Sequence, residues 1–202
     1  GTQGAVSARY KVKWDNTNIY VGVEVTDPTL CNANANWYDD DSVEIYIDGN
    51  NSHSATYAAD DYQYTIRYGD ATLRVMPTAL HPTANYSAST ALIAGGYAAE
   101  FRIPWSDLGV SPSTGTTVGF DLGLNHDETC GGARTGVLMW NGTGNNWTNT
   151  SAFGDAVLQA CAAISPTFTR TQSPTPSRTV SPTFTRSASA TSRNCRRVIR
   201  QT

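Results

Sequence analysis

Aromatic, carboxylate and amide side chains occur in this sequence at positions that a hydrophobic core does not need. Trp37 and Tyr38 stand in an acidic loop, and Glu44 lies on the polar row of the alternating stretch 42–48 that follows. Trp147 occupies a second polar loop, beside Asn145. Aromatic rings stack on the C–H faces of sugars, while carboxylates and amides bond to sugar hydroxyls. The combination indicates a carbohydrate site, although the acidic run alone would equally suit a solvated edge loop.

Several of the polar residues fall on strand faces opposite the apolar rows. In the stretch 42–48, Val43, Ile45 and Ile47 point one way and Glu44 the other, because successive side chains on a strand leave opposite faces. Arg67 and Asn125 hold the same polar positions on their own strands. Polar groups that converge from several strands beneath two loop-borne tryptophans fit a short sugar site.

A second group of oxygen-bearing residues brackets the loop after residue 48. Closely spaced carboxylate and amide oxygens are the ligands that a hard cation such as calcium takes. The spacing is not that of a standard calcium loop, so a solvated turn is the alternative. The expected ligands are Asp48, Asn50, Asn51, Asp60 and Asp61.

The four cysteines form no C-x₂-C pair and therefore match no zinc spacing. Cys31 and Cys130 lie in polar loops of the acidic part of the chain. If the protein is exported, we expect these two to form a disulfide; otherwise they are two free thiols.

The elements that position these residues are short strands separated by turns. Two alternating runs around an Asn/Asp turn at 15–18 predict a hairpin. No ten-residue stretch has a helical period. We therefore expect an all-β fold, a β-sandwich of two antiparallel sheets. The predicted strands are 6–15, 19–25, 42–48, 62–68, 73–76, 90–94, 97–103, 117–125, 135–140 and 156–159.

Charge and hydropathy exclude some partners. After residue 164 the chain holds seven Arg and no acid. The body of the chain, residues 1–164, therefore contains 14 − 7 = 7 basic residues and all 17 acidic residues, which gives it a formal net charge of about −10. A body this acidic is a poor nucleic-acid binder. No apolar run is long enough to cross a membrane. The start carries no signal peptide, so either processing removed one or the fragment begins downstream.

The chain divides into two parts. Residues 1–160 form the expected sandwich, and residues 161–202 a tail rich in Ser, Thr, Pro and Arg, in which Ser-Pro-Thr-Phe-Thr-Arg occurs at 165–170 and again at 181–186. Such a composition cannot bury a core, and we expect a disordered linker.

The sequence resembles family 9 carbohydrate-binding modules, which are β-sandwich modules of secreted plant-cell-wall hydrolases. The resemblance covers residues 6–160. It includes Lys13-Trp14-Asp15, the stretch from Trp37 to Asp48, Gly119-Phe120-Asp121, and Asn145-Asn146-Trp147 with Phe153-Gly154. It implies binding of glucan or xylan chain ends between two indoles, structural calcium and no catalysis. The family's opening segment is missing before Gly1.

Carried over by position, the resemblance assigns roles to individual residues. Trp147 matches one stacking indole and Glu44 the carboxylate that accepts sugar hydroxyls. Trp37 matches the other indole, although the family spacing also allows Tyr38 to hold that ring position. Arg134 matches a site arginine and Asn145 a site amide. A family arginine falls at Thr65, with Arg67 two residues on, and a family glutamine falls at Gly123.

The resemblance further implies a secreted protein whose partners are β-glucan or xylan and a catalytic domain on the same parent chain. Two other classes of protein are compatible with parts of the sequence. A glycoside-active domain would draw a pair of carboxylates from Asp39, Asp40, Asp41 and Glu44. A haem-binding or adhesion-type sandwich would pair Met76 or Met139 with a histidine.

Overall fold

The computed structural model describes residues 6–81, 85–160 and 197–201, the last range by its backbone. The regular secondary structure of the described residues consists of strands and one short 3-10 helix, η1 (Trp37–Asp39). The strands are β1 (Ser7–Trp14), β2 (Asn18–Thr26), β3 (Ser42–Asp48), β4 (Asp61–Arg67), β5 (Leu73–Met76), β6 (Ser87–Ile93), β7 (Gly96–Pro104), β8 (Thr117–His126), β9 (Gly136–Met139), β10 (Gly154–Leu158) and β11 (Arg197–Gln201).

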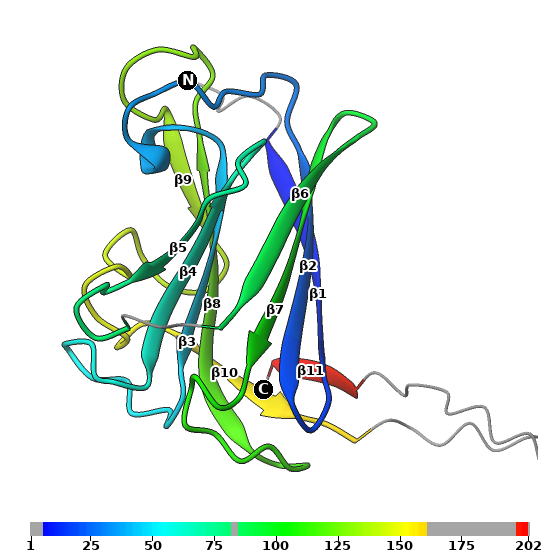
Figure 1. Cartoon of the computed structure of the whole chain (residues 1–202), viewed down its shortest axis with the longest axis vertical. Coiled ribbons are helices and arrows are strands. Elements are labelled where there is room, and N and C mark those ends of the chain that lie inside the picture. The colour runs from blue at the N-terminus through cyan, green and yellow to red at the C-terminus, as the bar shows by residue number, and fades with distance from the viewer. Residues whose placement is uncertain (1–5, 82–84, 161–196, 202) are drawn as a thin grey trace, which may run out of the picture.

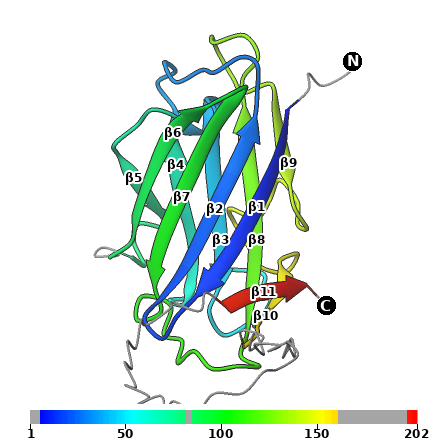
Figure 2. The ribbon, with the colours of Figure 1, turned by 90° about the vertical axis from the view of Figure 1, so that its right-hand side faces the viewer.

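Two antiparallel layers face each other, as the sequence predicted (Figure 1). One layer has the order β5-β4-β3-β8, and the far edge of β8 pairs with β9 along one half and with β10 along the other. The second layer has the order β1-β2-β7-β6 and lies across the front of the molecule in Figure 2. The predicted strands therefore all exist, with ends that differ by a few residues.

The core lies between the layers and is filled by the apolar rows of the alternating strands. On β3 the inward row is Val43, Ile45 and Ile47, each fully buried. Tyr64 on β4 and Trp105 after β7 are buried in the same core. Burial of one row forces the other row of each strand outward, and this fixes the direction in which Glu44 points.

Strand β11 differs from the expectation of a tail without regular structure. Its Val198 pairs with Lys13 of β1, and its Ile199 pairs with Leu158 of β10. The backbone of 197–201 thus fills the edge between the two layers, as Figure 2 shows. The rest of the tail predicted over 161–202 lies outside the described residues.

Several segments that carry site residues meet at one end of the first layer. Strand β3 begins there, β4 and β8 end there, and β9 begins there, because neighbouring strands are antiparallel. Helix η1 enters β3 at the same end (Figure 1). In the described residues, no helix has both the length and the apolar character that a bilayer crossing requires.

Candidate carbohydrate-binding site

Glu44 lies at the centre of a polar cluster on the outward face of β3. It is 4% exposed, and its carboxylate accepts three hydrogen bonds. Gln63 Nε2 and Asn125 Nδ2 both donate to Oε1, over 3.1 and 2.9 Å, and the Tyr46 hydroxyl donates to Oε2. Oε1 is therefore saturated, whereas Oε2 keeps one acceptor position. Burial raises the pKa of Glu44, although the three donors oppose that shift.

The register of the first layer explains how these side chains meet. Tyr46 lies directly opposite Gln63 on β4, and Glu44 lies opposite Gly123 on β8. Gln63 and Tyr46 were not predicted as site residues. Tyr46 lies two residues after Glu44 on the same outward row of β3, whereas Gln63 is brought to Glu44 by the pairing of β4 with β3.

Arg134 extends the cluster toward the rim, as its family position implied. Its Nη1 donates to Asn125 Oδ1 over 2.8 Å and to the Tyr38 carbonyl over 3.3 Å. The guanidinium also lies over the Tyr38 ring, 5.9 Å from the ring centre. A continuous chain of contacts therefore runs from Glu44 through Asn125 and Arg134 to an aromatic ring that is 41% exposed.

Trp37 and Tyr38 are both placed at this rim by η1, and their rings meet edge to face with 5.3 Å between centres. The Trp37 ring carries the Arg74 guanidinium over one face, at 5.7 Å. Tyr38 is the more exposed of the two side chains and the one joined to the Glu44 cluster. The structure thus favours Tyr38 as the ring that faces a ligand.

Arg67 has a different role from the one predicted. Its guanidinium donates to Asp40 over 2.8 Å and to Asp70 over 3.0 and 3.1 Å. It also donates to the Asn34 carbonyl, and the Asp70 and Asp40 carboxylates raise the pKa of Arg67. Arg67 therefore holds the loop that carries Trp37 and is not directed at Glu44.

The loop before β3 has a second anchor in the disulfide between Cys31 and Cys130, which confirms the predicted pairing. Nearby, Asp41 accepts hydrogen bonds from the backbone N–H of Cys31 and of Asp127, over 2.5 and 3.2 Å. The acids of the run 39–41 thus organise the loop, with Asp40 bound to Arg67 and Asp41 to backbone. They do not supply a second carboxylate bonded to Glu44.

Trp147 stands in a loop that is fixed to the same face of the first layer. Asp121, opposite Tyr46 on β8, accepts hydrogen bonds from the N–H groups of Asn141 and Gly142 and from Asn146 Nδ2. Burial raises the pKa of this carboxyl. The Tyr57 hydroxyl donates to the Asn146 carbonyl over 2.7 Å. These bonds fix the loop that carries Trp147, which is 60% exposed, to the outward face of β8, the face that also carries Asn125.

Asn145, predicted to supply an amide, lies in this loop and is exposed. Its backbone N–H donates to Thr143, and its carbonyl accepts from Thr148. Its side-chain amide makes no hydrogen bond to the residues that the structure describes. The amide is therefore available to a ligand that reaches Trp147.

Gly123 does not leave a cavity where the family has glutamine. A methyl group on Gly123 would lie 3.0 Å from Met139 Sδ, 3.3 Å from the Tyr46 ring and 3.4 Å from Glu44 Oε2. Met139 and Tyr46 thus occupy the space, and the methionine packs at the site without a histidine contact.

The predicted cation ligands are brought together in part. The carboxylate oxygens of Asp48, Asp60 and Asp61 lie within 4.8 Å of one another. Asp61 Oδ1 is buried and has no hydrogen-bond partner among the described residues, and the same holds for Asn51 Oδ1. Burial, with Asp48 and Asp60 adding to it, raises the pKa of Asp61 to about 6. Asn50 is exposed at the turn.

Comparison with known proteins agrees with this geometry. Residues 1–160 match the family model described as carbohydrate family 9 binding domain-like. A family 9 carbohydrate-binding module from Caldicellulosiruptor kristjanssonii in complex with cellotriose superposes with a TM-score of 0.70 at 31% identity, covering 82% of this chain and 83% of that one. The same type of module in complex with glucose gives a TM-score of 0.66 at 31% identity, over 77% and 78% of the two chains.

Two curated relatives are multidomain enzymes by name and size. Endo-1,4-beta-xylanase A of Thermoanaerobacterium saccharolyticum is 38% identical over 160 residues, which are 78% of this chain and 13% of the xylanase. Exoglucanase XynX of Acetivibrio thermocellus is 36% identical over 159 residues, which are 78% of this chain and 14% of that protein. The chain therefore spans about a seventh of the length of these relatives.

Proposed function

This chain belongs to the family 9 carbohydrate-binding domains, and on that premise we propose that it binds cello- and xylo-oligosaccharides around Glu44. The domain is a non-catalytic binding module by its family, and its enzyme relatives match it over only 13–14% of their length. The observation that carries the proposal is the Glu44 carboxylate. It is held by Gln63, Asn125 and Tyr46, keeps one free acceptor position and lies between two aromatic loops.

Each part of the cluster suits one part of a sugar. A hydroxyl donates to Glu44 Oε2, and a second hydroxyl accepts from the Asn145 amide. The Trp147 ring stacks on the C–H face of the pyranose, and Tyr38, backed by Arg134, covers the ring from the other rim. Because Glu44, Tyr38 and the backbone of the loop that carries Trp147 are held by protein contacts, binding orders few groups and so costs little entropy.

We further propose that the site binds specifically to the reducing end of a polysaccharide chain. A ring enclosed by two aromatic side chains leaves little room for sugar on both ends. A polar group that is bonded to one particular hydroxyl rejects analogues that lack it, since the group would be left unpaired. Support for this comes from the pair of exposed rings, Tyr38 and Trp147, on two separately anchored loops.

The biological setting is proposed on the same premise. Attachment to a catalytic domain would bring that enzyme to insoluble polysaccharide, and the disulfide supports a protein that is exported to an oxidising compartment. Calcium at Asp48, Asp60 and Asp61 is proposed because two buried oxygens there, Asp61 Oδ1 and Asn51 Oδ1, lack a donor. Oxygen ligands of this kind suit a hard cation, which would stabilise the loop after β3.

Titration calorimetry with cellotriose and xylotriose tests the function. We expect a Kd between micromolar and millimolar, about −4 to −8 kcal/mol. Trp147→Ala should weaken binding by at least about 2 kcal/mol, as truncation of a central aromatic does. Leu92→Ala, an exposed side chain on the β6–β7 hairpin, is the matched control and should bind normally. An unchanged affinity in Trp147→Ala would remove that loop from the site.

Recognition of the chain end is tested by comparing the affinities of two ligands. Cellotriose and the same sugar reduced to its alditol differ only at the terminal ring. Much weaker binding of the alditol is expected. Equal binding of both would refute end recognition but leave carbohydrate binding intact.

A further inference from the structure

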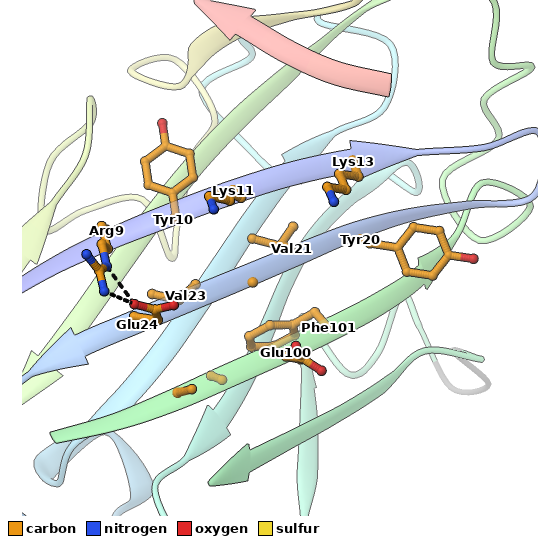
Figure 3. A pocket seen from close by; sticks show the side chains of 13 residues that line it. Arg9, Tyr10, Lys11, Lys13, Tyr20, Val21, Val23, Glu24, Glu100 and Phe101 are labelled. Atoms are coloured by element: carbon orange, nitrogen blue, oxygen red, sulfur yellow. Dashed lines mark hydrogen bonds and ion pairs between the residues drawn. The ribbon is translucent and has the colours of Figure 1, made fainter. Parts of the chain in front are cut away.

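The outer face of the second layer carries a hollow of about 530 Å³ (Figure 3). Glu44 lies on the outward face of the other layer, on β3. Its floor is the strand pair β2 and β7 at Gly22, where an added methyl group would meet no atom within 4 Å. The register places Lys11 on one side of Gly22 and Glu100 on the other. A volume of this size lies within the range of small-ligand sites, about 300–1,000 Å³.

One wall of the hollow is an aromatic ring that is fixed in place. Tyr20 lies next to Gly22 on the outward row of β2, opposite Lys13 of β1. Its hydroxyl donates to Asp15 Oδ2 over 2.9 Å and accepts from Asn18 Nδ2 over 3.3 Å. The ring therefore stands as an ordered wall at the edge of the hollow, of the kind that packs against a sugar ring.

The face is positively charged, although the body as a whole is strongly acidic. Seven of the Lys and Arg residues precede residue 165, and four of these lie on the outer face of β1 and β7: Arg9, Lys11, Lys13 and Arg102. The acids between them are Glu24, which is bound to Arg9 over 2.5 Å, and Glu100. Asp15, whose carboxylate accepts from the Tyr20 hydroxyl, is a third acid at the edge of this face, so the face has a net charge of about +1.

The two lysines are the groups that a ligand would use. In the part of the chain that the structure describes, neither Lys11 nor Lys13 makes an ion pair or a hydrogen bond, and the Glu100 carboxylate makes none either. Figure 3 shows both lysines rising from β1 beside the hollow, with Glu100 across the floor. An ammonium binds a carboxylate through charge-assisted hydrogen bonds, while Glu100 can accept from hydroxyls.

We propose that this hollow is a second glycan site, specific for an acidic sugar such as a uronic acid borne on a xylan chain. The carboxylate lies between Lys11 and Lys13, the ring rests over Gly22 against Tyr20, and a hydroxyl donates to Glu100. Because the two sites lie on opposite faces, one module can contact a chain end at Glu44 and an acidic branch on a neighbouring chain. Two such contacts, made to polysaccharide chains on either side of the module, raise the retention of the module without strengthening either site.

The test follows backbone amide signals of the full chain by nitrogen-15 NMR during titration. The ligands are xylotriose and the same trisaccharide bearing one glucuronic acid. The acidic trisaccharide should shift Gly22 and its neighbours saturably, and still do so in Trp147→Ala, where the Glu44 site is impaired. The double variant Lys11→Gln with Lys13→Gln should weaken this binding at least tenfold. Arg102→Gln, a charge removed from the same face but outside the hollow, should weaken it less than threefold.

Two outcomes would overturn the proposal. If xylotriose shifts Gly22 as strongly as its acidic derivative does, the hollow does not select acidic sugars. If neither ligand shifts Gly22, there is no site. Either result leaves the Glu44 site untouched, because that site is read independently from the Trp147 and Glu44 variants.

Discussion

Asn125 Nδ2 donates a 2.9 Å hydrogen bond to Glu44 Oε1, and this bond joins the two halves of the carbohydrate site. On its other side, Asn125 Oδ1 accepts from Arg134, which in turn supports Tyr38. Asn125 is 1% exposed, and both ends of its amide are bonded within the protein, to Ser42, Glu44 and Arg134. Its role is to orient a carboxylate and a guanidinium that the ligand can reach.

Asn125→Ala should therefore weaken cellotriose binding although the residue does not touch the sugar. Removing the amide leaves Glu44 with one donor fewer and frees the Arg134 guanidinium to move. Loss of a buried hydrogen-bond partner of a charged group costs about 1–3 kcal/mol. Calorimetry at 25 °C, with a thermal melt to confirm folding, measures the effect. A folded variant with wild-type affinity would show that the chain of bonds does not orient the site.

Tyr38→Ala should reduce affinity more than Trp37→Ala. The Tyr38 ring is exposed and connected to Glu44 through Arg134, whereas the Trp37 ring is covered on one face by Arg74. We expect a loss of at least about 2 kcal/mol for Tyr38→Ala. Tyr38→Phe keeps the ring and should retain most of the affinity. A larger loss in Trp37→Ala would assign the stacking ring to the indole.

Much of this architecture could be predicted from the sequence, because the alternating rows of β3, β4 and β8 identify both the strands and their outward residues. The outward direction of Glu44 and Asn125 followed directly. Gln63 could not be assigned, because it shares its polar row with Thr65 and Arg67, and the alternation does not reveal the register with β3. The register places Thr65 directly opposite Glu44 and Gln63 opposite Tyr46, and the longer Gln63 side chain reaches Glu44 diagonally.

Other differences arise from side-chain contacts that a one-dimensional pattern does not contain. Arg67 shares the face of Glu44, but Asp40 and Asp70 lie closer and bind its guanidinium. Gly123 removes a side chain, and Met139 from β9 fills the space. Strand β11 comes from five residues with no alternating polar pattern, and its pairing depends on the free edges of β1 and β10.

The stability of the fold should fall as the pH rises through the titration of Asp41. Burial raises the pKa of this carboxyl from 3.8 to about 7, so the folded state holds a proton that the unfolded state releases near pH 4. Folding is therefore favoured by this group below about pH 4, and that contribution is lost as the pH rises toward 7. Thermal melts in a pH series should show the decrease, with the disulfide kept oxidised throughout.

The Asp41→Asn variant separates this effect from other titrating groups. Asparagine cannot ionise, so the variant should show a shallower decrease in melting temperature between pH 4 and 7 than the wild type, while Asp61, whose pKa burial also raises, accounts for part of the remainder. A pH dependence in Asp41→Asn as steep as that of the wild type would mean that another group is responsible.

Removal of calcium should lower the melting temperature. A ligand that binds only the folded state stabilises it by mass action, about 2.7 kcal/mol at a concentration of 100 Kd. Melts with added calcium and with chelator measure the difference. The response should disappear in Asp61→Asn and persist in Glu100→Gln, an acid on the opposite face. Identical wild-type melts in both conditions would argue against a cation at Asp48, Asp60 and Asp61.

The central claim is that Glu44 accepts a hydrogen bond from a sugar hydroxyl. Titration of the Glu44→Gln variant with cellotriose tests it most directly. Glutamine fits the existing network, since its Oε1 still accepts from Gln63 and Asn125. The Tyr46 hydroxyl can turn to accept from the new amide. The variant should therefore melt close to the wild type, yet it loses the free acceptor of Oε2. We predict binding at least tenfold weaker, about 1.4 kcal/mol. Wild-type affinity in a folded Glu44→Gln protein would contradict the account.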